Sequence, residues 1–219
     1  MLTRRRKSGR ACGFSLVEMA VSLAVLGLLL GLVAMIQERG NNASEEALAR
    51  ASAEARLRRA LDRVAADLTG IGRTLLFPDP TTPFGSSTAT FQHPSGVSGT
   101  GAVLWDTPSR IEILLDPRET DNGIDDDGDG LADERRLVRT VNVGTGSQRS
   151  TTLCNGIPEL MGGETVNGLD DNGNGITDEA GFNIRRTGDL LTVRLSVQQA
   201  FGDGQVATAT METSIVLHN

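Results

Sequence analysis

An uncharged apolar run near the N-terminus constrains this chain more than any other feature. No residue from Met19 to Ile36 carries a charge, and the stretch from Phe14 to Ile36 holds 23 residues. At ~1.5 Å per residue, a helix of that length reaches roughly 34 Å, which exceeds the ~30 Å hydrocarbon core of a bilayer. The sequence therefore predicts one membrane-spanning helix.

The residues before this run indicate how it lies in the membrane. They include five basic residues and no acidic one: Arg4, Arg5, Arg6, Lys7 and Arg10. Because positive flanks stay cytoplasmic, the positive-inside rule predicts a cytoplasmic N-terminus and an exported remainder. A secretory signal peptide has a shorter apolar core of ~7–15 residues and a small-x-small cleavage site, so that reading fits poorly. We expect a single-pass inner-membrane protein with a periplasmic C-terminal domain.

Residues 13–18, Gly-Phe-Ser-Leu-Val-Glu, lead directly into the apolar run. This segment resembles the N-terminal motif of type IV prepilins and type II secretion pseudopilins, and the resemblance covers about the first quarter of the chain. It implies that residues 1–13 are a leader, which prepilin peptidase removes after Gly13. Phe14 then becomes the N-methylated first residue, and Glu18 pairs with the N-terminal amine of a neighbouring subunit. The implied partners are other pilin or pseudopilin subunits, and the subunit ends in a filament or at the cell surface.

Glu18 is unusual on physical grounds as well. A carboxylate in a lipid-facing helix costs ~2.5–3.5 kcal/mol on insertion scales, and it commonly marks a function or a partner. The alternative is that Glu18 stays hydrated at the headgroup level, where a negative charge near a helix start is also favourable. Both interpretations remain open from the sequence.

The remaining residues suit one exported domain of ordinary size. We assign residues 14–40 to the membrane and filament-core helix and residues 41–219 to the domain. An amphipathic helical stretch continues after the span, with Leu57, Leu61, Val64 and Leu68 at helical spacing. These residues predict a helix that packs one face against a sheet.

Strand patterns dominate the second half of the chain. Residues 77–101 are rich in Pro, Gly, Ser and Thr and predict a surface loop, with a short strand near residues 88–92. Strand patterns follow at residues 102–105, 110–115, 136–141, 190–197 and 212–217. The predicted fold class is α+β, with a long N-terminal helix packed on an antiparallel sheet. This order is similar to that of the larger J-type minor pseudopilins and the W-type minor pilins.

Composition and motifs exclude several functions. The chain of 219 residues has a net charge of −7 and only 3% aromatic residues, so neither a nucleic-acid surface nor a base-stacking platform is expected. It contains no Gly-x-Ser-x-Gly elbow, no phosphate-binding Gly loop with Lys and no His-Glu-x-x-His pair. We predict that the protein is not an enzyme.

Two acidic loops repeat each other. Residues 119–134 match residues 164–179 at ten of sixteen positions, and the loops hold eight and five acidic residues without a Lys or Arg. Oxygen-bearing side chains alternate in each loop before a Gly, as in the Asp-x-Asp-x-Asp-Gly calcium loops of extracellular repeat proteins. Calcium takes six to eight oxygen ligands, and a cation would relieve the repulsion among the carboxylates. The sequence therefore predicts one or two calcium ions.

The predicted ligands use side-chain oxygens and two backbone carbonyls. They are Asp125, Asp127, Asp129, the carbonyl of Leu131, and Asp133 or Glu134 in the first loop, and Asp170, Asn172, Asn174, the carbonyl of Ile176, and Asp178 or Glu179 in the second. The pattern departs from an EF-hand, because Arg136 and Gly181 stand at the twelfth loop position where an EF-hand has Glu. The alternative is a pair of solvated acidic turns.

A second function fits the same residues. A single-pass membrane protein with a calcium-dependent exported domain could act as an adhesion or binding module, and the N-terminal motif would then be accidental. The mature N-terminus discriminates between the two hypotheses, because an N-methylated Phe14 excludes the second.

Overall fold

The computed structural model describes residues 15–72, 76–79, 85–202 and 204–217. Gly13 and Phe14, the predicted processing residues, lie outside the described residues. One helix precedes nine strands: α1 (Leu16–Leu68), β1 (Thr88–Phe91), β2 (Pro94–Val97), β3 (Val103–Trp105), β4 (Ser109–Leu115), β5 (Arg135–Val141), β6 (Arg149–Ile157), β7 (Phe182–Thr187), β8 (Leu190–Phe201) and β9 (Gln205–Val216).

A capping box starts α1. Ser15 Oγ accepts hydrogen bonds from the backbone N–H groups of Val17 and Glu18, at 3.2 and 3.4 Å. In return, the Ser15 N–H donates to the Glu18 carboxylate at 2.9 Å. This reciprocal pair satisfies donors that the first helical turn leaves free, so the helix begins directly after Ser15. At the other end, Gly70 adopts a positive φ of 81°, which favours termination of the helix there.

The chain divides into two compact units, residues 1–44 and residues 45–219. In the first unit every described side chain is exposed, including the apolar side chains from Leu16 to Ile36. By length and composition, α1 can cross a membrane. An apolar surface without protein partners fits a helix segment surrounded by lipid, as the sequence predicts.

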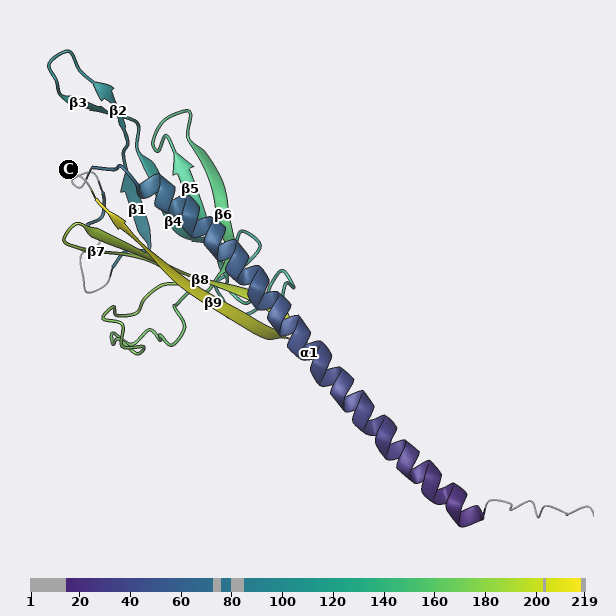
Figure 1. Ribbon diagram of the computed structural model, residues 1–219. Coiled ribbons are helices and arrows are strands. Elements are labelled where there is room, and N and C mark those ends of the chain that lie inside the picture. Colours follow the sequence, from purple (N-terminus) through teal and green to yellow (C-terminus); the bar gives the residue numbers. More distant parts are fainter. Residues whose placement is uncertain (1–14, 73–75, 80–84, 203, 218–219) are drawn as a thin grey trace, which may run out of the picture. The chain divides into compact units, whose positions relative to one another are not determined.

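The second unit contains the rest of α1 and three antiparallel sheets (Figure 1). Their strand orders are β1-β4-β5-β6, β2-β3 and β7-β8-β9. The predicted stripe of Leu57, Leu61, Val64 and Leu68 is buried, and it shares one core with residues of both larger sheets, such as Ile111, Leu137 and Leu195. The predicted α+β class is confirmed. The strands form three sheets rather than the single sheet expected. β2 and β3 pair only with each other, and β7, β8 and β9 form a sheet of their own after β6.

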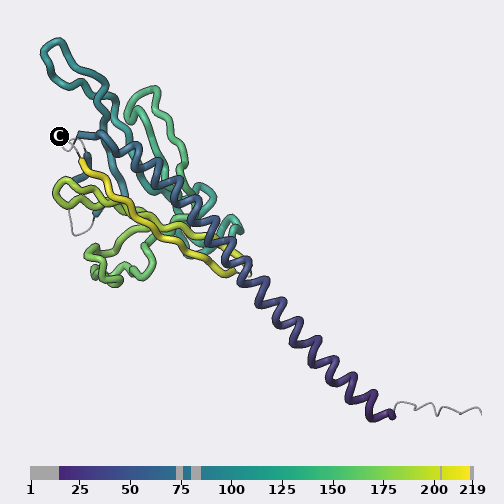
Figure 2. The backbone as a smooth tube through the Cα atoms, viewed as in Figure 1, coloured from purple at the N-terminus to yellow at the C-terminus, as the bar shows by residue number. Residues whose placement is uncertain are grey.

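The acidic loops lie at two different connections. The first loop joins β4 to β5, which are neighbours in one sheet, and the second lies between β6 and β7, which belong to different sheets. The second loop is the long irregular green segment in Figure 2. Both loops belong to the unit that starts at Glu45.

Candidate functional site

The two acidic loops have the same backbone conformation. Each has four residues with positive φ at matching positions: Gly123, Gly128, Gly130 and Asp133 in the first loop, and Gly168, Gly173, Gly175 and Asp178 in the second. The base of each loop is closed in the same way. The Asp116 N–H donates to the Glu134 carbonyl at 3.0 Å, and the Met161 N–H donates to the Glu179 carbonyl at 2.7 Å. The sequence repeat is therefore also a structural repeat.

Short side-chain bonds to the backbone hold the alternating aspartates of the first loop in place. Asp125 accepts from the N–H groups of Gly128 and Gly130, at 2.7 and 2.8 Å. Asp127 accepts from the Asp129 N–H at 3.0 Å, and Asp129 accepts from the Leu131 N–H at 2.9 Å. Each carboxylate oxygen has two lone pairs, so these bonds still leave acceptor capacity for a cation.

Two groups of three carboxylates form in this loop. One oxygen each from Asp116, Asp127 and Glu134 lie within 4.8 Å of one another, and so do oxygens from Glu119, Asp125 and Asp127. Asp127 belongs to both groups. Of the predicted ligands, Asp127 thus lies with Glu134 in one group and with Asp125 in the other, and the structure adds Asp116 to the first group and Glu119 to the second.

Glu119 is a structural anchor of the loop as well as a member of one group. Its buried carboxylate accepts from the N–H groups of Asp126, Asp127 and Asp133, at 3.2, 3.0 and 3.3 Å. The sequence contained a signal for it, because Glu164 stands at the matching position of the second loop. Asp116 had no such signal, since its counterpart is Met161.

Glu134 is a buried carboxylate with one unpartnered oxygen. Only 2% of the residue is exposed, and its Oε2 has no hydrogen-bond partner. Burial, together with the nearby charges of Asp129, Glu119 and Asp127, raises the pKa of Glu134 to about 7. A buried carboxylate oxygen without a donor is costly, and a metal ion would satisfy it.

One basic side chain lies beside the carboxylates. Arg118 places its guanidinium 2.9 Å from Asp127 Oδ2 and 3.4 Å from Asp116 Oδ1. Asp127 is the main cause of the raised pKa of Arg118. The Arg118 side chain is 63% exposed, so water screens this ion pair and limits its contribution.

The other predicted ligands of the first loop have different positions. The Asp133 carboxylate accepts from the N–H groups of Asn122 and Gly123, so it holds the outer part of the loop rather than joining a carboxylate group. Burial raises the pKa of Asp129, and the nearby charges of Asp127 and Asp125 raise it further. Asp129 therefore lies near the two carboxylate groups. The Leu131 side chain is buried.

The second loop repeats the backbone bonds with less charge. Asp170 accepts from the N–H groups of Gly173, Asn174 and Gly175, and Asn172 and Asn174 cap the following turns. Asp178 accepts from Asn167 and Gly168, as Asp133 does from its partners, and Ile176 is buried. Within residues 164–179, all of which are described, no group of three carboxylates forms.

The second loop also has an internal cation. Glu179 is fully buried, and Arg194 of β8 lies 3.2 Å from its Oε2. Asn174 Nδ2 donates to the same oxygen. Glu179 thus has the partners that Glu134 lacks in the first loop, and Arg194 supplies the positive charge.

The raised pKa of Glu134 predicts how metal-free stability depends on pH. The folded chain binds this proton more tightly than the unfolded chain, whose pKa is near the ordinary 4.5. The resulting stabilisation is complete below about pH 4.5 and is lost as pH rises through about 7. In chelator, Glu134→Gln should remove this loss, which amounts to about 3 kcal/mol. Denaturation of both proteins across this range measures it, and identical pH slopes would contradict the prediction.

The N-terminal segment is similar to a known protein family. Residues 8–34 match the prokaryotic N-terminal methylation motif. The motif contains Gly13, Phe14 and Glu18, and it includes the capping box and most of the apolar run. It supports a type IV pilin or pseudopilin subunit, which prepilin peptidase processes and which assembles with other pilin subunits. Such subunits are structural proteins rather than enzymes. Comparisons with curated proteins and with solved structures found no match.

Proposed function

We propose that this chain is a minor pilin or pseudopilin, a structural subunit of a type IV pilus or of a type II secretion-type filament. The observation that carries the proposal is the methylation motif at the head of a capped, membrane-length helix. The α+β unit that follows α1 is consistent with a pilin-like subunit. In this proposal the chain is held in the inner membrane with its second unit in the periplasm, and the processed subunit then joins a filament.

The mature N-terminus tests this proposal. Mass spectrometry of the membrane-bound protein should show a chain that starts at N-methylated Phe14. Gly13→Leu should leave a full-length precursor, because a bulky side chain would stand where the peptidase needs Gly. A wild-type chain that keeps its first thirteen residues, or complete processing of the Gly13→Leu variant, would reject the proposal and favour a membrane-anchored binding module.

We further propose that calcium stabilises the exported unit by binding in the first acidic loop. All donors there are oxygens, which suits a hard cation that takes six to eight oxygen ligands. The unpartnered Oε2 of Glu134 supports the fit, because this carboxylate belongs to a group with Asp116 and Asp127, and a cation would satisfy it. Either carboxylate group would hold the ion: Asp127 with Asp116 and Glu134, or Asp127 with Glu119 and Asp125.

The second loop is the weaker candidate for calcium. Asn172 and Asn174 replace two aspartates, and Arg194 already neutralises Glu179. Affinities of ~10⁻⁴–10⁻³ M are typical of extracellular calcium modules, and we expect the first loop to bind more tightly than the second.

A further inference from the structure

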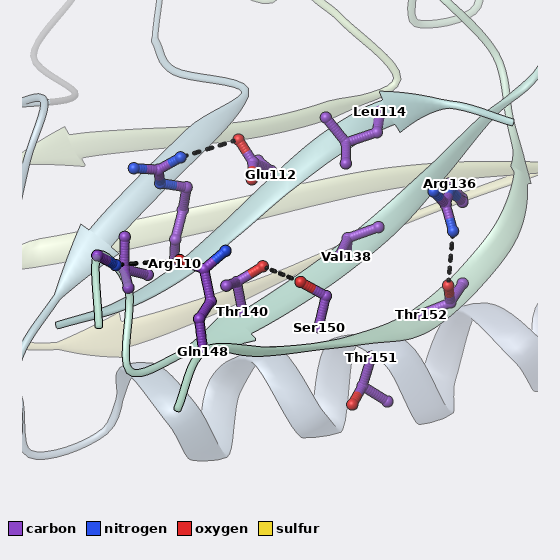
Figure 3. A pocket seen from close by; sticks show the side chains of 12 residues that line it. Arg110, Glu112, Leu114, Arg136, Val138, Thr140, Gln148, Ser150, Thr151 and Thr152 are labelled. Carbon is purple, nitrogen blue, oxygen red and sulfur yellow. Dashed lines mark hydrogen bonds and ion pairs between the residues drawn. The ribbon is translucent and has the colours of Figure 1, made fainter. Parts of the chain in front are cut away.

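A groove lies on the face of the four-stranded sheet that is turned away from the core. Ile111 and Leu137 point into the core with α1, so their neighbours along β4 and β5 point to the opposite face. The groove on that face has a volume of about 490 Å³, within the range of small-molecule sites. Figure 3 shows the lining side chains, which come from β4, β5, β6 and the β5–β6 turn.

The floor of this groove is buried although it lies on the outer face of the sheet. Val138 is 2% exposed and Thr140 is 5% exposed. Both come from β5, and Glu112 and Arg110 of β4 stand beside them in the sheet. Polar interactions made beside such poorly hydrated groups are stronger than those made in water.

Arg136 supplies an unmatched positive charge at one side of the groove. Its guanidinium donates to Thr152 Oγ1 at 3.4 Å, and its Nε is buried without a hydrogen-bond partner. No ion pair among the described residues includes Arg136, whereas Arg110 lies 3.6 Å from Glu112. The groove therefore carries one net positive charge, although the chain as a whole is acidic.

The remaining polar groups of the groove still offer free hydrogen-bond donors. The hydroxyls of Thr140 and Ser150 lie 2.9 Å apart, so one donates to the other and one proton stays free. Gln148 uses its amide oxygen to accept from the Gly144 N–H, which leaves its NH₂ group as a donor. Donors arranged around an unpaired guanidinium are suited to a carboxylate.

We propose that this groove binds a small, singly charged carboxylate that also carries hydroxyl groups. The carboxylate pairs with Arg136, and the hydroxyls of the ligand bond to Thr140, Ser150 and Gln148. No aromatic residue lines the groove, so charge and hydrogen bonds rather than ring stacking select the ligand. This proposal is independent of the assignment to a filament and of the calcium loops.

Glucuronate and glucose form a matched pair of probes, because they differ by one carboxylate. Titration calorimetry on the full chain in detergent micelles should give a Kd of ~1 mM for glucuronate and no saturable binding of glucose. Arg136→Gln should weaken glucuronate binding at least tenfold, as loss of a charge-assisted bond implies. Arg149→Gln is the control, since it removes the same charge from β6 outside the groove and should change Kd less than twofold.

Thr152→Val provides a second test if Arg136→Gln fails to fold. The Thr152 hydroxyl accepts the hydrogen bond that orients Arg136. Because Thr152 is exposed, its substitution should leave the unfolding temperature the same while glucuronate binding weakens severalfold. Absence of glucuronate binding, or equal binding by wild type and Arg136→Gln, would overturn the proposal. Equal affinity for inorganic phosphate would also overturn it, because the groove would then be a general anion site.

Discussion

If calcium binds in the first acidic loop as we propose, replacing Asp127 with Ala is expected to remove most of the stabilisation that the ion gives. Asp127 belongs to both carboxylate groups of the first loop, so the substitution disrupts both. For wild type, calcium at ~100 times its Kd should raise the free energy of unfolding by about 2.7 kcal/mol per occupied site. The measurement is the unfolding temperature of the full chain in micelles, with chelator and with millimolar calcium. Each protein serves as its own reference, so a direct effect of the substitution on folding cancels.

Asn172→Ala is the matched control, because Asn172 stands where Asp127 stands in the other copy of the loop. It should lose much less of the calcium effect, since Arg194 already stabilises Glu179 in that loop. Magnesium should substitute poorly, because it prefers a smaller octahedral site. If the unfolding temperature of wild type is the same in chelator and in calcium, the metal proposal is wrong and the loops are solvated acidic turns.

Local patterns predicted the elements that have strong periodicity. The stripe from Leu57 to Leu68 predicted the buried face of α1, and the strand pattern at residues 190–197 predicted β8, in which Leu191, Val193, Leu195 and Val197 are buried. β6 was missed because its first four residues are Arg, Ser, Thr and Thr and are exposed at a sheet edge, so its pairing with β5 rather than its own propensity makes it a strand. β2 was missed because Pro94 and Gly96 argue against a strand, although a peripheral hairpin tolerates both.

Prediction of the site had a similar limit. Alternation within the repeat was enough to propose Asp125 and Asp127, which the structure places in one carboxylate group, and Asp127 also lies with Glu134 in another. Arg194 could not be inferred, since pairing of β7 with β8 brings it back to Glu179 from outside the repeat. Asp116 likewise precedes the repeat and reaches the first loop through its backbone bond to Glu134. The charge balance of the two loops therefore depends on tertiary contacts as well as on their different numbers of acidic residues.

One pair of variants can separate the capping role of Glu18 from its proposed role in assembly. Its carboxylate accepts from the Ser15 N–H in the capping box, and the family resemblance implies a second role as the partner of a neighbouring subunit's N-terminal amine. Glu18→Gln keeps a side-chain oxygen that can accept this hydrogen bond but removes the charge, whereas Glu18→Ala removes both. Both variants should still insert into the membrane, because each removes a charge from an apolar helix.

If the charge on Glu18 pairs with an amine, both variants should enter sheared filaments at least tenfold less than wild type. A charge-assisted hydrogen bond contributes ~1.5–3 kcal/mol, and loss of that amount lowers an association constant by about that factor or more. Immunoblots of the filament and membrane fractions measure incorporation, and mass spectrometry of the N-terminus confirms that processing is unchanged. Wild-type incorporation of Glu18→Gln together with failure of Glu18→Ala would show that Glu18 acts only as a helix cap. Wild-type incorporation of both variants would show that Glu18 is not needed for assembly and is simply hydrated at the headgroup level.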